Sequence, residues 1–131
     1  MRVLIDTHTF IWFVSDLTKI GTKSVEIIEN PDCFIQISIA SIWEISIKTS
    51  RGKLSVAGGF PYVETDLINN SIKILPVTFD HTLANNRLPF HHKDPFDRMI
   101  AAQAIVEGID LISVDNIFDS YFAGTEVKRI W

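Results

Sequence analysis

The sequence predicts a single α/β domain in which helices flank a central parallel sheet of four to five short strands. Two observations predict this fold class. Short apolar runs alternate along the chain with segments of helical periodicity, which is the order expected for a parallel sheet covered on both faces. The length of 131 residues and the hydrophobic content of 47% are typical of one globular unit with a sizeable core. We therefore expect residues 1–131 to form one domain.

The first expected strand covers residues 2–5, which are mostly β-branched or aliphatic. Asp6 follows directly, so its side chain should lie at the C-terminal end of this strand. Asp6 or Thr7 can cap a helix that continues through Val14. A further helix is expected over residues 22–28.

The second expected strand covers residues 33–37, and the segment after it is ambiguous. Isoleucines alternate there as they would in a strand, whereas Ser38 or Ser41 can begin a helix. Ser41 and Glu44 have the spacing of a capping box, and Lys48 follows Glu44 by four residues. These two spacings favour a helix.

The third expected strand covers residues 72–79, with Asp80 at its end. A helix over residues 61–70 should precede it, because Pro61 suits the first position of a helix. A polar helix that reaches Asn86 should follow.

The C-terminal third opens with the strongest local signal. Asp94 can cap a helix whose first residue is Pro95, and Gly108 can end it after about Val106. Asp97 precedes apolar residues by three and four positions, so its side chain should point toward the apolar side of this helix. The remaining expected elements are a fourth strand over 109–114 that ends at Asp115, a short helix over 116–122 and an edge strand over 127–131.

Charge and composition limit the class of protein to which this chain can belong. The net charge of −4 argues against a broad basic surface that coats nucleic acid, although Lys48, Arg51 and Lys53 form a local basic cluster. Cys33 is the only cysteine, so no intrachain disulfide can form. Neither a signal-peptide core nor a membrane-spanning run is visible. We expect a cytoplasmic protein with no membrane association.

Four acids are expected to converge. Asp6 and Asp115 should lie beyond the C-terminal ends of parallel strands, where open α/β sheets bind ligands, and Glu44 and Asp97 lie in early turns of helices. Two carboxylates ~4 Å apart repel by ~4 kcal/mol at an effective dielectric constant of 20, so such a cluster needs a cation. Oxygen ligands favour Mg²⁺ or Mn²⁺, whereas zinc would require more histidine or cysteine.

A divalent ion held by carboxylates suits hydrolysis of a phosphodiester, because the metal can activate water and offset charge on the phosphate. A basic rim would then hold the flanking phosphates, with Arg51, Lys53, Lys93 and Arg98 as candidates.

Each acid also has an ordinary structural explanation. Asp6 and Asp115 can be helix caps, Glu44 can pair with Lys48, and Asp97 can complete the cap made by Asp94. On that view the chain is a non-catalytic module that binds a partner or one structural ion. A phosphoacceptor receiver domain would need adjacent acids near the N-terminus, and Asp6 stands alone.

Taken together, four motifs resemble those of the PIN-domain ribonucleases, in particular the VapC-type toxins of toxin-antitoxin pairs. The motifs are Val3-Leu4-Ile5-Asp6-Thr7-His8, Ile42-Trp43-Glu44-Ile45 with Lys48, Asp94-Pro95-Phe96-Asp97-Arg98-Met99-Ile100-Ala101 and Ser113-Val114-Asp115 with Phe118. They occur in the family's order and span nearly the whole chain.

The resemblance implies a PIN fold, Mg²⁺- or Mn²⁺-dependent endoribonuclease activity on RNA, a homodimer, and inhibition by a cognate antitoxin with which the toxin assembles. Asp6, Glu44, Asp97 and Asp115 match the family's acidic quartet, which implies catalytic and metal-binding roles. Thr7, Lys48, Arg51, Arg98 and Ser113 are the residues expected to contact substrate. The loop His91-His92-Lys93 varies in the family, so no role is assigned to it.

Overall fold

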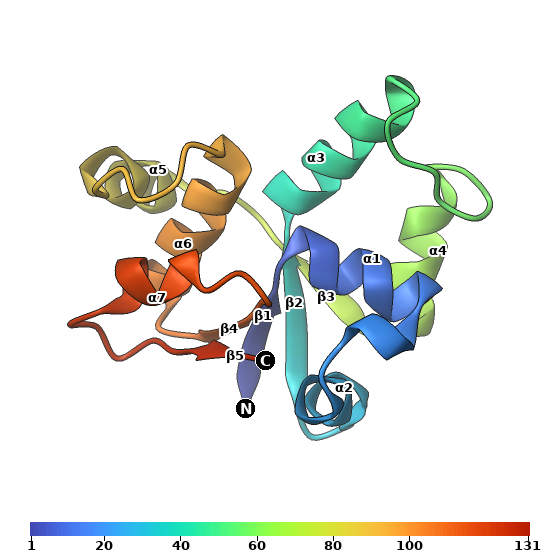
Figure 1. Ribbon diagram of the computed structural model, residues 1–131, viewed down its shortest axis with the longest axis horizontal. Coiled ribbons are helices and arrows are strands. Elements are labelled where there is room, and N and C mark those ends of the chain that lie inside the picture. The colour runs from blue at the N-terminus through green and yellow to red at the C-terminus, as the bar shows by residue number, and fades with distance from the viewer.

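The computed structural model describes residues 1–131 and confirms the α/β class (Figure 1). Five parallel strands form one sheet in the order β3-β2-β1-β4-β5. The strands are β1 (Arg2–Ile5), β2 (Phe34–Ser38), β3 (Ile72–Leu75), β4 (Asp110–Ile112) and β5 (Arg129–Ile130). The helices are α1 (Thr7–Ser15), α2 (Thr22–Glu29), α3 (Ile39–Ser50), α4 (Tyr62–Asn69), α5 (Phe79–Arg87), α6 (Pro95–Glu107) and α7 (Ile117–Phe122), with a 3₁₀ turn at Leu17–Lys19.

The strand order reverses direction once. The chain runs outward from β1 through β2 to β3, and then returns to place β4 on the other side of β1. In Figure 1 the helices α1, α2 and α4 lie on one side of the strands, whereas α5, α6 and α7 lie on the other. The reversal therefore lies between β1 and β4, and the C-terminal ends of these two strands are where a ligand site is expected.

Two apolar layers pack against the sheet, one on each face, and β1 contributes side chains to both. Val3 and Ile5 are fully buried in a layer that also contains Phe10 of α1, whereas Leu4 points to the opposite layer with Phe118 of α7. This alternation is the period of two expected for a strand covered on both faces. Because β1 is buried on both sides, the backbone of Asp6, which follows it, is held in a fixed position. None of the helices combines the length and apolar character needed to cross a bilayer.

The predicted start and end of α6 are confirmed. The Asp94 side chain accepts hydrogen bonds from the backbone N–H groups of Phe96 and Asp97, at 2.8 and 3.2 Å, and Pro95 is the first helical residue. Gly108 ends the helix with φ of +66°, a left-handed conformation that glycine adopts without strain.

Two local predictions were wrong. The third strand ends at Leu75, not at Phe79, because Pro76 has no N–H to donate and Thr78 caps α5, so Asp80 lies inside that helix. The capping box also proved misplaced: Ser38 caps α3 by accepting the N–H of Ala40, and Ser41 and Glu44 lie within the helix.

Candidate active site

Asp6 is fixed at the end of β1 by two hydrogen bonds. Its Oδ1 accepts the backbone N–H of Thr9 at 2.9 Å, which makes it the cap of α1, and its Oδ2 accepts the Ser113 hydroxyl at 2.6 Å. The residue is only 4% exposed. Burial raises the pKa of the Asp6 carboxyl, although the hydrogen bonds from Ser113 and Thr9 oppose the increase.

Ser113 joins Asp6 to Asp115. The buried hydroxyl donates to Asp6 and accepts the backbone N–H of Asp115 at 3.1 Å, so the ends of β1 and β4 are tied together at the strand-order reversal. Asp115 itself accepts the N–H of Ile117 through Oδ1 at 3.0 Å, and its Oδ2 is left to face the site. Asp6 is therefore the cap of α1, and Asp115, one residue before the cap position of α7, is joined to it through Ser113.

Asp97 reaches the same cluster from the first turn of α6. Its side chain is 19% exposed, and its pKa is raised to about 7 by burial and by the negative charges of Asp94, Asp6, Glu44 and Asp115. The inward direction predicted for Asp97 is thus confirmed. A carboxyl that titrates near neutral pH indicates negative charge that the protein itself does not fully compensate.

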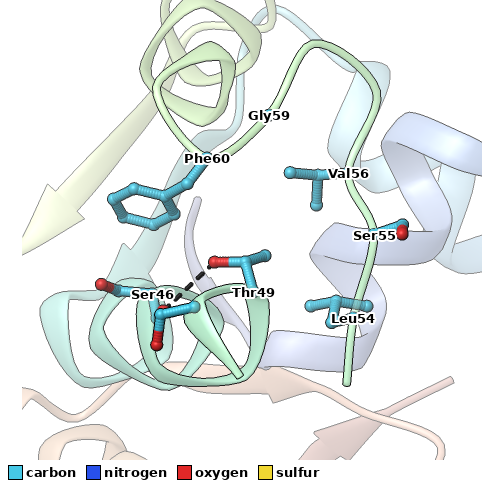
Figure 2. Close-up of a pocket in the computed structure, with 8 residues that line it drawn as sticks. Ser46, Thr49, Leu54, Ser55, Val56, Gly59 and Phe60 are labelled. Atoms are coloured by element: carbon cyan, nitrogen blue, oxygen red, sulfur yellow. Dashed lines mark hydrogen bonds between the residues drawn. The ribbon is translucent and has the colours of Figure 1, made fainter. Parts of the chain in front are cut away.

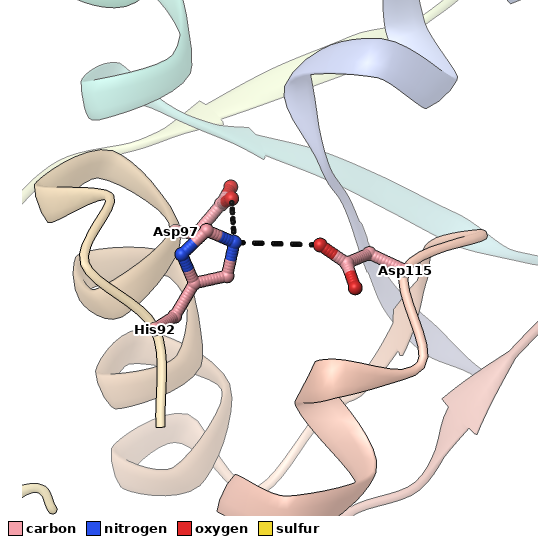
Figure 3. A group of neighbouring side chains, drawn as sticks. All are labelled: His92, Asp97 and Asp115. Atoms are coloured by element: carbon pink, nitrogen blue, oxygen red, sulfur yellow. Dashed lines mark ion pairs between the residues drawn. The ribbon is translucent and has the colours of Figure 1, made fainter. Parts of the chain in front are cut away.

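His92 is the residue that sequence reasoning missed. Its Nε2 lies 3.1 Å from Asp97 Oδ2 and 3.4 Å from Asp115 Oδ2, and Figure 3 shows the ring placed between the two carboxylates. The three side chains offer ligand atoms within 4.8 Å of one another. The only signal for His92 in the sequence was its position two residues before a helix cap, which does not reveal a contact with Asp115 far along the chain.

Glu44 belongs to the same acidic cluster, and both of its oxygens have partners. It is 3% exposed; Oε1 accepts the Thr7 hydroxyl at 2.7 Å, and Oε2 lies 2.6 Å from Nζ of Lys48. The Glu44 hydrogen bond raises the pKa of Lys48, and the charges of Asp94 and Asp97 contribute to the same increase. Lys48 is therefore the resident cation of the acidic cluster.

The residues expected to contact substrate differ in their exposure. Thr7 and Ser113 are 2% and 0% exposed, so they orient acids and do not reach a ligand directly. Arg98 is also buried and does not face a phosphate site as expected, because its guanidinium donates to the carbonyls of Asn85, Leu88 and Pro89 at 3.0, 3.3 and 2.8 Å. Arg51 remains exposed after α3.

The donor set suits a hard divalent cation. Asp97 and Asp115 offer carboxylate oxygens that lie within 4.8 Å of each other, Asp6 adds its negative charge, and the raised pKa of Asp97 indicates that added positive charge would be stabilising there. By contrast, a pocket of about 410 Å³ beyond α3 contains no titratable side chain (Figure 2). Its lining consists of Ser46, Thr49, Ser50, Leu54, Ser55, Val56, Gly59 and Phe60. Of these two regions, only the acidic cluster carries ionisable groups.

Comparisons with known proteins agree with this geometry. The model of the PIN domain family matches residues 3–122. VapBC2 from Rickettsia felis, bound to a promoter DNA fragment, has 17% identity and a TM-score of 0.72 over 99% of this chain and 98% of that one. DNA-bound VapBC from Salmonella typhimurium has 16% identity and a TM-score of 0.72, and VapBC-1 from Haemophilus influenzae has 17% and 0.69, each over 98% of both chains. At these identities the likeness is one of fold. No curated protein matches the sequence.

Proposed function

Because this chain belongs to the PIN-domain family, we propose that it is a divalent-metal-dependent endoribonuclease and the toxin of a toxin-antitoxin pair. The observation that carries the proposal is the approach of Asp97 to Asp115 at the reversal of strand order, where burial and nearby negative charges, that of Asp6 among them, raise the pKa of Asp97 to about 7. A purely structural set of helix caps would not need to place three carboxylates in one cluster.

Mg²⁺ or Mn²⁺ is the proposed cofactor, held by Asp6, Asp97 and Asp115. When bound, such an ion lowers the pKa of a water and offsets negative charge on a phosphate. Ser113 keeps Oδ2 of Asp6 in one orientation. This hydrogen bond limits the freedom of a carboxylate that must face the ion.

Glu44 is proposed to support these ligands from a buried position. Thr7 and Lys48 hold its two oxygens, so it contributes charge and position without moving. RNA phosphates would be met by basic side chains that are exposed in the structure. Arg51, Lys53 and Lys93 satisfy that condition, and Arg98 does not.

The proposed partners are a cognate antitoxin and a second copy of this chain. Support for the antitoxin comes from the fold likeness to chains in VapBC complexes. Support for a protein interface comes from Trp43, Phe79 and Phe90, which are 64%, 80% and 85% exposed. Light scattering should give twice the chain mass for the wild type and a lower mass for Trp43→Glu. Leu17→Glu, at an exposed apolar residue elsewhere, should remain dimeric.

Cleavage of RNA by the purified chain tests the nuclease. We expect total RNA to be cut with Mg²⁺ or Mn²⁺ and to stay intact with EDTA. Asp97→Asn and Asp115→Asn should each lower the rate at least ~100-fold, since each removes a carboxylate that would hold the divalent cation. Asp32→Asn is the matched control, because Asp32 is exposed and makes no side-chain contact with the cluster.

Full-rate cleavage by Asp97→Asn, with contaminating nuclease excluded, would contradict the proposal. So would the absence of any cleavage by the wild type together with retained partner binding, which is the behaviour expected of a non-catalytic module on this fold.

A further inference from the structure

We infer that His92 occupies the position of the cation in the metal-free protein, so that its ring must move out before a divalent ion can bind. The inference rests on the proposed metal site and concerns a residue outside the acidic quartet. Figure 3 shows the ring nitrogen directed at Asp97 on one side and at Asp115 on the other.

The hydrogen-bond polarity of the ring identifies His92 as a donor. Its Nδ1 accepts the backbone N–H of Asp94 at 3.0 Å. A neutral imidazole carries one proton, so the proton resides on Nε2, the atom that lies 3.1 Å from Asp97 Oδ2 and 3.4 Å from Asp115 Oδ2. A histidine that ligates metal through Nε2 shows the opposite polarity, because it donates its other N–H to a carbonyl or carboxylate. His92 therefore has no electron pair free on Nε2 for an ion.

The ring and the ion would compete for the same oxygens. Nε2 lies 3.1 Å from Asp97 Oδ2 and 3.4 Å from Asp115 Oδ2. Mg²⁺ sits about 2.0–2.1 Å from its oxygen ligands and requires near-octahedral space around them. An ion shared by these two oxygens would fill the space that the Nε2–H now occupies.

The backbone that carries His92 is anchored, so the ring alone has to move. Arg98 donates to the carbonyls of Leu88 and Pro89, and the Tyr121 hydroxyl accepts the backbone N–H of His92 at 2.8 Å. The His91 ring packs edge-on against Tyr121 at 5.0 Å. Because 27% of the His92 side chain is exposed, rotation about its side-chain bonds can carry the ring toward solvent.

Binding of Mn²⁺, followed by calorimetry at constant pH, distinguishes this inference from a role as ligand. His92→Ala should bind Mn²⁺ roughly 10-fold more tightly than the wild type, the factor that corresponds to ~1.4 kcal/mol for the displaced contact of the ring with the two carboxylates. His91→Ala is the matched control and should bind like the wild type. Equal or weaker binding by His92→Ala would overturn the inference.

The control Asp115→Asn separates this test from that of the proposed function. If the wild type binds Mn²⁺ and Asp115→Asn does not, the metal site stands, and the sign of the His92→Ala effect decides the inference alone. If neither the wild type nor His92→Ala binds Mn²⁺, both are overturned.

A second measurement uses the wild-type protein and so does not depend on the folding of a variant. Nitrogen-15 NMR of the histidine rings should show His92 protonated on Nε2 in EDTA, and addition of Mg²⁺ should change its ring signals while those of His81, which is paired with Glu107 at the other end of α6, stay constant. A His92 ring protonated on Nδ1 in EDTA, or unaffected by saturating Mg²⁺, would contradict the inference.

Discussion

Glu44 and Asp97 are two acids of one cluster, yet the protein compensates their charges differently. Glu44 is almost fully buried, with a lysine and a hydroxyl on its two oxygens. Asp97 is less buried but faces other acids, and the ring nitrogen of His92, 3.1 Å from its Oδ2, is its nearest basic atom in the cluster. Burial alone therefore does not identify a metal ligand. In our proposal Glu44, whose charge is compensated, supports the site, and Asp97, whose charge is not compensated, binds the cation.

The largest predicted effect on stability is that of Asp97→Asn in the absence of metal. The folded-state pKa of Asp97 is raised to about 7 from an ordinary value of 3.8. The unfolded chain therefore binds fewer protons between these two values, so stability falls as pH rises through the window. Asp97→Asn should stabilise the protein at pH 8, by up to ~4 kcal/mol, and should have little effect near pH 4.

Urea unfolding of both proteins in EDTA at pH 8 and at pH 4 would check this prediction. Addition of Mg²⁺ should reverse the order, because only the wild type gains stability from binding. A variant that is less stable than the wild type at pH 8 in EDTA would show that the charge of Asp97 is compensated after all.

Lys48→Met, unlike Asp97→Asn, should lower the free energy of unfolding. It leaves the buried Glu44 carboxylate without its cation, which costs roughly 3–5 kcal/mol for a fully buried pair. Since the Lys48 side chain is 41% exposed, water can replace part of the interaction, and we expect a loss of ~2 kcal/mol in the free energy of unfolding. Lys53→Met, at an exposed lysine nearby in sequence, is the control and should change stability by less than ~0.5 kcal/mol.

Ser113→Ala should have a smaller effect, and chiefly on the metal site. It removes the hydroxyl that donates to Asp6 Oδ2, so the carboxylate is less well oriented toward an ion. We expect Mn²⁺ affinity to fall about 10-fold in calorimetry, with Ser113→Thr retaining affinity near that of the wild type. If Ser113→Ala binds as well as the wild type, Asp6 is not oriented by this hydroxyl.

Local sequence signals predicted the fold where a single residue decides the outcome. Asp94, Pro95 and Gly108 set the limits of α6 as expected, because capping and proline geometry depend on the adjacent backbone alone. The same kind of reasoning failed at α5. There the third residue of the capping box is His81, whose Nδ1 accepts the N–H of Thr78, whereas the usual sequence pattern has Glu or Gln at that position. Before α3, Ser38 and Ser41 were both expected as possible starts of the helix, and the structure selects Ser38.

The site was predictable only as a set of acids. Their positions after β1 and β4 and in α6 follow from strand ends and helix period, so convergence could be expected. The directions of Arg98 and His92 could not, because each depends on contacts with segments distant in sequence or on a loop without periodicity. Arg98 thus proved to be a support for the loop that carries His92, and His92 proved to be part of the cluster.

The most direct test of the account is the titration of the Asp97 carboxyl carbon by carbon-13 NMR, with and without Mg²⁺. We predict a midpoint at about pH 7 in EDTA, as burial and the neighbouring acids require, and a midpoint below about 5 with saturating Mg²⁺. A midpoint near 3.8 in EDTA, or one that Mg²⁺ does not lower, would contradict the claim that Asp97 carries the uncompensated charge of a divalent-metal site.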